Sequence, residues 1–332
     1  MKRKVSLLLA GILLVAGFAV GCKDNKEDIT VYMPDGAPAL ALAQLMAEDK
    51  EKDGVSYNVV PATMIASKVT NEDNKKNADL CVMPVTAASK LLGTGEKYVM
   101  LGAVTHGNLY LLAKEGEYNA QNLSSLIGKT VGVLQINEVP GLTLKAVLNK
   151  YQIPWQEVTN DGGIVADKVN LLAISGADAV GTVEADCFMI AEPAATAQGK
   201  KGYTIVGSLQ ELYDVEKGYP QAVLVAKKDF VENNEAWTKE FVAKVEGAAT
   251  WLKTASGEEI VAAVSAHMED AQTATSLKAP LLSSAVISRC GIYFTYASAC
   301  QNEVNAFLSG MLAVNNKAAA IPALDFYWKY TK

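Results

Sequence analysis

Polar side chains directly follow four short apolar runs of the chain. They are Asp35 after 29–33, Thr86 after 79–83, Gln135 and Asn137 after 130–134, and Glu192 after 186–190. Carboxylate, hydroxyl and amide groups of this kind can form hydrogen bonds with a polar small molecule. Each also has a plainer role, because Asp, Thr and Glu beside a helix start fit turns and caps. The chemistry that these groups indicate is reversible binding through hydrogen bonds.

A strand, a turn and a helix recur at each of these four places. The β-rich runs lead through turns into helical hydrophobic patterns. This alternation predicts an α/β architecture with mostly parallel sheets. Proline at a helix start is favourable because the first N–H groups lack intrahelical partners. The predicted helices are 39–48, 87–92, 140–150 and 194–198, with Pro38, Pro140 and Pro193 at the start of three of them.

The strand ends locate the predicted site. In open α/β sheets, ligands bind beyond the carboxyl ends of the strands, where helix N-termini offer N–H groups and partial positive charge. Two of the four loops lie in an N-terminal portion and two in a middle portion, so all four line one cleft if the halves face each other. The predicted ligand-binding residues are Asp35, Gly36, Ala37, Pro38, Pro84, Val85, Thr86, Ala87, His106, Asn108, Gln135, Asn137, Glu192 and Arg289.

Two of these residues have competing interpretations. Arg289 is the only Arg after Arg3 and lies in an apolar stretch. If buried, it needs either an acidic side chain or an anionic ligand as its partner, and we favour the acidic side chain. A lone histidine such as His106 is more often a structural residue than a ligand contact. Its position before a chain crossover, beside Asn108, nevertheless places it near the predicted cleft.

Two extended segments, 109–113 and 222–226, flank the middle portion of the chain. Such segments are expected where a chain crosses twice between two lobes. After Lys228 the pattern is helical to the end, and its first helix has one apolar face, so the C-terminal helices should pack on the first lobe. That face consists of Trp237, Phe241, Val245, Ala248 and Leu252. The predicted domains are lobe 1 from 29–113 and 218–332, and lobe 2 from 114–217.

The N-terminus has the pattern of an export signal. Three basic residues precede an apolar run that is the length of a secretory h-region and short for a membrane span. Small residues then lead into Cys22, which resembles the bacterial lipobox. We predict a signal peptide over 1–21, acylation of Cys22 with palmitate-type chains, and a polar tether over 22–28. The acyl chains would hold the protein on the extracytoplasmic face of the cell membrane.

Composition excludes several classes of function. The chain has 332 residues, half of them hydrophobic, which is long enough for two domains and unlike a disordered or fibrous protein. Its formal charge is −6, and no basic cluster follows the first residues, so a nucleic-acid partner is not expected. With only His106 and His267 and no Cys-x-x-Cys, no metal site or other cofactor is expected.

Four cysteines remain after Cys22. Cys81 and Cys187 lie in apolar runs that favour buried thiols. Cys290 and Cys300 could form a disulfide in an exported protein.

The usual enzyme motifs are missing. Gly128-Lys129-Thr130 lacks the earlier glycine of a phosphate-binding loop and precedes a strand, not a helix. Gly93-Thr94-Gly95 is followed by Tyr98 where a dinucleotide fingerprint requires glycine, and no Gly-x-Ser-x-Gly is present. Missing motifs do not by themselves exclude an enzyme, because related folds host enzymes that act on bound solutes. The predicted export and lipidation argue against one, because cofactors and activated substrates are cytoplasmic, and we predict that the protein is not an enzyme.

Several phrases in combination resemble a known family. They are "DGAPAL", "MPVTAAS", "GKTVGV…VPGLTLK" and "AEPAAT". With the lipobox, they are similar to the solute-binding lipoproteins of ABC importers, in the group that includes nitrate-, alkanesulfonate-, taurine- and thiamine-pyrimidine-binding proteins. The resemblance spans nearly the whole chain after Cys22. The family's Gly-Gly-Lys-like stretch before its terminal aromatic motif is replaced here by 318–322.

The resemblance implies a type II periplasmic-binding-protein fold, with two α/β lobes joined by a double crossover. It also implies a monomeric receptor that closes over a small organic solute and delivers it to a permease and an ATPase. A sulfonate, a carboxylate or a heteroaromatic vitamin precursor would be such a solute. Two alternatives stay open, namely an exported enzyme on the same scaffold and a sensing receptor without transport.

Overall fold

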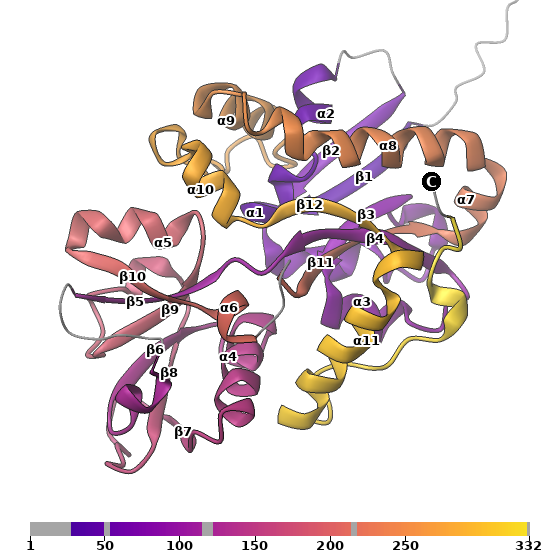
Figure 1. Cartoon of the computed structure of the whole chain (residues 1–332). Coiled ribbons are helices and arrows are strands. Elements are labelled where there is room, and N and C mark those ends of the chain that lie inside the picture. The colour runs from indigo at the N-terminus through magenta and orange to yellow at the C-terminus, as the bar shows by residue number, and fades with distance from the viewer. Residues whose placement is uncertain (1–27, 50–53, 115–121, 214–217, 331–332) are drawn as a thin grey trace, which may run out of the picture.

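The computed structural model describes residues 28–49, 54–114, 122–213 and 218–330. The predicted signal peptide, Cys22 and all of the tether except Asp28 lie outside these ranges. Within them, the strands form two six-stranded sheets, one in each of two lobes (Figure 1).

The first sheet has the order β12-β4-β11-β3-β1-β2. Its strands β1, β2 and β3 are parallel, and β11, β4 and β12 are added through antiparallel pairs. The bounds are β1 (Ile29–Pro34), β2 (Val55–Val60), β3 (Leu80–Pro84), β4 (Tyr98–His106), β11 (Pro220–Lys227) and β12 (Ile292–Tyr296).

The second sheet repeats this arrangement in the order β10-β5-β9-β6-β8-β7. Its parallel strands are β9, β6, β8 and β7, while β5 and β10 are antiparallel. The bounds are β5 (Leu109–Lys114), β6 (Thr130–Leu134), β7 (Trp155–Val158), β8 (Val169–Ile174), β9 (Cys187–Ala191) and β10 (Tyr203–Ser208).

Helices cover both sheets. Lobe 2 carries α4 (Val139–Lys150), α5 (Ala194–Ala197) and α6 (Leu209–Tyr213). Lobe 1 carries α1 (Ala37–Leu40), α2 (Ala43–Glu48), α3 (Val85–Leu92), α7 (Lys228–Asn233), α8 (Glu235–Trp251), α9 (Gly257–Ala266), α10 (Ser284–Arg289) and α11 (Ala297–Val314). Short 3₁₀ turns are η1 (Ala62–Lys68), η2 (Asn74–Lys76), η3 (Leu123–Leu126), η4 (Ala177–Ala179), η5 (Gln198–Lys201), η6 (Ala279–Leu281) and η7 (Leu324–Phe326).

The chain crosses between the lobes twice, and the two crossings lie side by side. The first is Gly107-Asn108 between β4 and β5, and the second leads through Gly218-Tyr219 into β11. The Gly107 N–H donates to the Tyr219 carbonyl at 3.0 Å. Gly218 has a φ of 76°, and a Cβ there would lie 2.9 Å from the His106 carbonyl oxygen, so glycine permits this close approach. The two-lobed α/β fold with its double crossover is thus as the sequence predicts.

The sheets are more mixed than the predicted mostly parallel ones. The antiparallel pairs involve β4, β5 and β11, which carry the chain between the lobes and so run against their neighbours. The order of strands and helices along the sequence does not show whether a strand runs parallel or antiparallel to its neighbours in the sheet. It also misplaces the boundary between the lobes: residues 109–113 belong to the second sheet, although the prediction put them in lobe 1. The first crossing is only two residues long, and the amino-acid composition does not change there, so the sequence has no signal that marks this boundary.

Three local predictions need correction. The helix predicted over 39–48 is two helices, separated by the buried residues Ala41 and Leu42. Pro38 and Pro140 lie one residue inside their helices, and Pro193 is an N-cap. The helical pattern after Lys228 is interrupted by β12, whose sequence IYFTY favours a strand.

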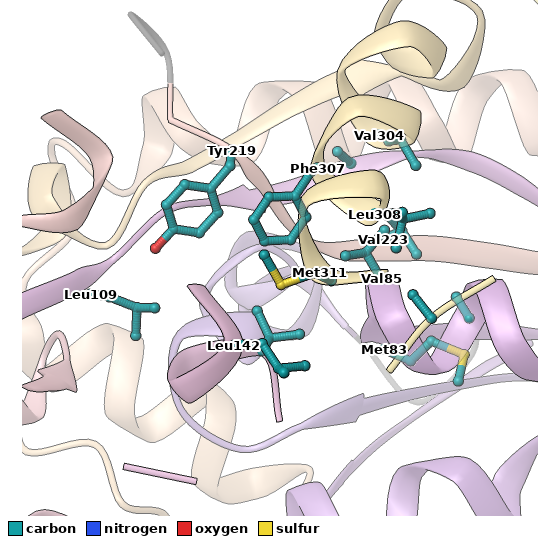
Figure 2. Close-up of a cluster of buried hydrophobic side chains, with 14 of the residues drawn as sticks. Met83, Val85, Leu109, Leu142, Tyr219, Val223, Val304, Phe307, Leu308 and Met311 are labelled. Carbon is teal, nitrogen blue, oxygen red and sulfur yellow. The ribbon is translucent and has the colours of Figure 1, made fainter. Parts of the chain in front are cut away.

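One buried apolar cluster extends through both lobes at the crossover. It includes Met83 of lobe 1, Leu142 of lobe 2, and Phe307 and Met311 of α11 (Figure 2). The ring of Phe307 stacks on Tyr219, with 4.8 Å between the ring centroids. The other C-terminal helices, α8, α9 and α10, contribute to a separate lobe 1 cluster. Helix α11 therefore packs on lobe 1 and also against the lobe 2 helix α4 (Figure 1).

Candidate functional site

A cavity of about 730 Å³ opens between the lobes and is lined from both. Thr63 of η1 contributes from lobe 1, and the end of β8 together with the segments after the lobe 2 strands contributes the rest. Its polar lining consists of Thr63, Gln135, Asn137, Glu138, Asn160 and Ser175, and the other lining residues are Ala, Ile and Val. A volume of this size is in the ordinary range for small-molecule sites.

The loop between β6 and α4 forms much of the lining. Gln135 has a φ of 47°, in the left-handed region that residues with side chains rarely adopt. Its N–H donates to the Ile174 carbonyl at 3.2 Å, which joins this loop to the end of β8. The side chains of Gln135 and Asn137 are exposed to the cavity. Two predicted site residues therefore lie in one loop, and one of them is held in a strained conformation.

A buried lysine supports this loop from behind. The Nζ of Lys145 donates to the Ile136 carbonyl at 2.9 Å and to Oε1 of Glu157 at 2.7 Å. It also approaches Oδ1 of Asn137 at 3.5 Å. The Lys145 side chain is only 3% exposed, so these partners compensate the charge. Lys145 therefore acts as a positioning residue for 135–138.

The start of α4 faces the same cavity. Glu138 is the N-cap residue, and its exposed carboxylate partly neutralises the partial positive charge of the helix N-terminus. Pro140 occupies the second helical position and has no N–H to offer. This helix start is consequently less attractive to an anion than an ordinary one.

A second group of residues, called the hinge cluster here, consists of His106, Asn108, Glu192, Thr196 and Arg289. Arg289 at the end of α10 donates from Nε to Oε1 of Glu192 at 2.7 Å and from Nη2 to Oγ1 of Thr196 at 2.8 Å. Glu192 also accepts from the Thr196 N–H and hydroxyl, at 2.9 and 2.7 Å. These bonds connect lobe 1 to lobe 2, because Arg289 and Glu192 come from different lobes.

The structure shows Arg289 paired with an acidic side chain, which is the alternative that we favour from the sequence. The Arg289 side chain is about one-third exposed, whereas the Glu192 side chain is fully buried. Tyr110 on β5 adds a further bond, since its hydroxyl donates to the Arg289 carbonyl at 3.1 Å. Burial raises the pKa of Tyr110 to about 12, so this hydroxyl keeps its proton.

His106 and Asn108 extend the hinge cluster along the first crossing. The Asn108 backbone and side chain both bond the Glu192 main chain, at 2.9 and 3.2 Å. The His106 ring stacks on Tyr293 with 3.7 Å between centroids, and its Nε2 lies 3.4 Å from Oγ1 of Thr295. Burial lowers the pKa of His106 to about 3, so the ring is neutral near pH 7.

Two buried polar atoms of this segment are unusual. Nδ1 of His106 and Oδ1 of Asn108 have no hydrogen-bond partner among the described residues. A buried polar atom without a partner costs free energy, and most such atoms in native proteins are paired.

The structure thus divides the predicted residues into groups. Gln135 and Asn137 line the cavity, and His106, Asn108, Glu192 and Arg289 form the hinge cluster with Thr196. Asp35 instead accepts bonds from the Thr275 hydroxyl and the Ser276 N–H within lobe 1. The remaining predicted residues lie at the starts of α1 and α3, outside the cavity lining. They are Gly36, Ala37, Pro38, Pro84, Val85, Thr86 and Ala87.

Four polar residues of the lining were not predicted: Thr63, Glu138, Asn160 and Ser175. Ser175 directly follows β8, and Thr63 follows β2 by three residues. Strand β8, VNLLAI, has nearly the same apolar-run-then-turn pattern as the four that were recognised, and extending the search to it would have found Ser175. Strand β2, VSYNVV, contains Ser and Asn and lacks that pattern, so Thr63 gave no comparable signal.

The described cysteines are Cys81, Cys187, Cys290 and Cys300, and all four are buried and free. Cys290 and Cys300, for which a disulfide was an open possibility, belong to different apolar clusters. Burial raises the pKa of Cys300 to about 12, which makes its thiol unreactive.

Comparisons with known proteins place these features in context. The family model described as NMT1/THI5 like matches residues 51–256, which is more than half of the chain. No curated protein matches the chain.

Several solved structures share the fold. An ABC transporter protein from Parabacteroides distasonis is 19% identical, with a TM-score of 0.70 over 92% of this chain and 100% of that one. The periplasmic aliphatic sulphonate binding protein SsuA from Escherichia coli is 16% identical, with a TM-score of 0.63 over 92% and 93%. SsuA from Xanthomonas axonopodis pv. citri, bound to MOPS, is 10% identical, with a TM-score of 0.58 over 89% and 96%.

Proposed function

The chain belongs to the NMT1/THI5-like family, and on this basis we propose that it is the solute-binding component of an ABC import system. It takes a small organic molecule into the cleft between its lobes and delivers it to a membrane permease. The observation that carries this proposal is the cavity of about 730 Å³, lined by Thr63 from one lobe and by strand-end loops from the other. The structural neighbours described as ABC-transporter and sulphonate-binding proteins support it.

Binding would proceed by closure of the lobes about the double crossover. A solute that contacts Thr63 and the 135–138 loop together touches both lobes and so stabilises the closed arrangement over an open one. The hinge cluster favours the same arrangement, because separating the lobes at that point breaks the bond between Arg289 and Glu192.

Within the cleft, we assign solute contacts to Gln135 and Asn137. His106 and Asn108 are assigned the hinge side, because each has a buried polar atom that lacks a partner. Glu192 and Arg289 hold each other and are assigned to lobe closure.

We also propose that the protein is anchored by acyl chains on Cys22, as a monomer on the extracytoplasmic face of the membrane. In the part of the chain that the structure describes, no helix is long and apolar enough to span a bilayer. Replacement of Cys22 by Ser should move the protein from the membrane fraction to the soluble fraction. Retention of the C22S variant in the membrane would contradict acylation at this residue.

The binding function is tested by thermal unfolding of the full chain with a panel of sulfonates, carboxylates, nucleobases, vitamins and amino acids. A solute at a hundredfold excess over its Kd stabilises the folded state by about 2.7 kcal/mol, which is readily measured. Closure should also slow hydrogen exchange in the hinge cluster. If no solute of the panel changes stability, before or after unfolding and refolding to release trapped ligand, the proposal fails. Turnover of a stabilising solute would instead show an enzyme.

A further inference from the structure

The charges around the cavity restrict which solute it can hold, and this inference rests on the proposed function. Among the described lining residues there is no Lys, Arg or His. The one charged side chain among these described residues is the carboxylate of Glu138, at the N-cap of α4. The other polar groups are the amides of Gln135, Asn137 and Asn160 and the hydroxyls of Thr63 and Ser175, which are all neutral.

Two cations of the elements around the cleft, Lys145 and Arg289, already have partners. Lys145 lies behind the loop, bound to the Ile136 carbonyl and to Glu157, and its side chain is 3% exposed. Arg289, the only Arg after Arg3, is bound to Glu192 and Thr196. To bind an anion, Arg289 would have to give up its buried Glu192 carboxylate, and Lys145 its buried Ile136 carbonyl. Leaving such a partner unpaired is costly.

The N-terminus of α4 does not replace the missing cation as a partner for an anion. The first turn of a helix ordinarily attracts anions through its N–H groups and partial positive charge. At α4 the Glu138 carboxylate opposes that charge and Pro140 removes one N–H. The Glu138 carboxylate is instead an acceptor, which favours a solute that donates a hydrogen bond to it.

From these observations we propose that the cleft selects a neutral or cationic solute that carries N–H or O–H donors, and rejects sulfonates and carboxylates. An anion would lose its hydration without gaining a cationic partner. A neutral donor-bearing molecule can form hydrogen bonds with the amides and hydroxyls of the lining. A cation gains the Glu138 carboxylate in addition.

The test uses calorimetric titration of the full chain with sets of isosteric probes that differ in charge. One set is benzamidine, benzamide, benzoate and benzenesulfonate. For each solute that stabilises the protein in the thermal panel, a second set of analogues carries an amidine, an amide, a carboxylate or a sulfonate on the framework of that solute. We expect binding of amidine or amide members to be at least tenfold tighter than that of the carboxylate and sulfonate members. An anionic member that binds as tightly as its amide, or an anion as the strongest binder of the panel, overturns the inference.

Two variants test whether Glu138 causes the preference for cationic solutes. Glu138→Gln should weaken the cationic members about tenfold relative to the neutral ones. Glu258→Gln is the matched control, because Glu258 is an exposed carboxylate near a helix N-terminus as well, in the first turn of α9, and does not line the cavity. It should leave the charge preference unchanged. Equal effects of the two variants would also overturn the inference. Failure of every probe and every panel solute to bind would refute the proposed function itself, which is a distinct result.

Discussion

Arg289 and Glu192 join the two lobes through an ion pair with 2.7 Å between Nε and Oε1. Arg289 ends a lobe 1 helix, and Glu192 follows the lobe 2 strand β9. The carboxylate is fully buried and has Thr196 as a second partner, so the guanidinium compensates a charge that would otherwise be costly. This pair is therefore a contact that lobe opening must break.

Replacing Arg289 by Met should destabilise the folded protein by about 2 kcal/mol, because Glu192 remains buried without its cation. Denaturant unfolding measures this loss. The hinge cluster should also exchange its amide hydrogens faster in the variant without solute. Combining the change with Glu192→Gln removes the stranded charge, so the double variant should be more stable than Arg289→Met alone. Additive losses from the two substitutions would show that the residues do not act as a pair.

Lys145→Met should cost about 1–3 kcal/mol, because the Ile136 carbonyl and Glu157 lose a charged donor. Solute affinity should fall as well, since Lys145 positions the 135–138 loop. Lys244→Met is the matched control: Lys244 forms an exposed pair with Glu240 on α8, and such pairs contribute little. Urea unfolding and titration of both variants separate the cases. A Lys145→Met protein as stable as Lys244→Met would contradict the positioning role.

Gln135→Gly should have opposite effects on stability and binding. Glycine relieves the left-handed conformation at φ 47°, which should increase stability by up to about 1 kcal/mol. The same change removes an amide that lines the cavity, so solute affinity should fall. Gln152→Gly is the control, because Gln152 has a φ of 56° in an exposed turn after α4 and does not line the cavity. It should gain stability and keep its affinity, and an equal loss of affinity in both variants would refute the assignment.

His106 should make the protein less stable in acid. Its pKa is lowered by burial from 6.5 to about 3, so between these values the unfolded chain binds a proton that the folded protein does not. The stability that neutral His106 provides is complete above pH 6.5 and is lost as the pH falls towards 3, by about 1.4 kcal/mol per pH unit. Unfolding of the native protein and His106→Gln across this range measures the difference. Parallel pH profiles would show that the ring titrates normally.

The sequence predicts the elements better than their connections. The apolar runs 29–33, 79–83, 130–134 and 186–190 are strands in the structure, each within one residue of the expected bounds. Hydrophobic periodicity and turn residues carry that information locally. The antiparallel insertion of β11 between β3 and β4 depends on the path of the chain between the lobes, which no local pattern contains.

The site is predictable to a similar extent. Gln135 and Asn137 could be identified because they follow a strand in the same loop. The partnership of Arg289 with Glu192 joins residues 97 apart in the sequence, so only the need for an acidic partner could be foreseen. Asp35 looked like a ligand contact, but Thr275 and Ser276, which arrive from far along the chain, already satisfy its carboxylate.

The central claim is that solute binds in the cavity between the lobes. The most direct test measures the Kd of a stabilising solute for the native chain, for Ser175→Trp and for Ser309→Trp. Ser175 lines the cavity, and a Trp side chain would fill part of it, whereas Ser309 is exposed on α11 and not part of the lining. The account predicts at least a hundredfold loss of affinity, or about 2.7 kcal/mol, in Ser175→Trp and little change in Ser309→Trp. Unchanged affinity in a folded Ser175→Trp protein would contradict it.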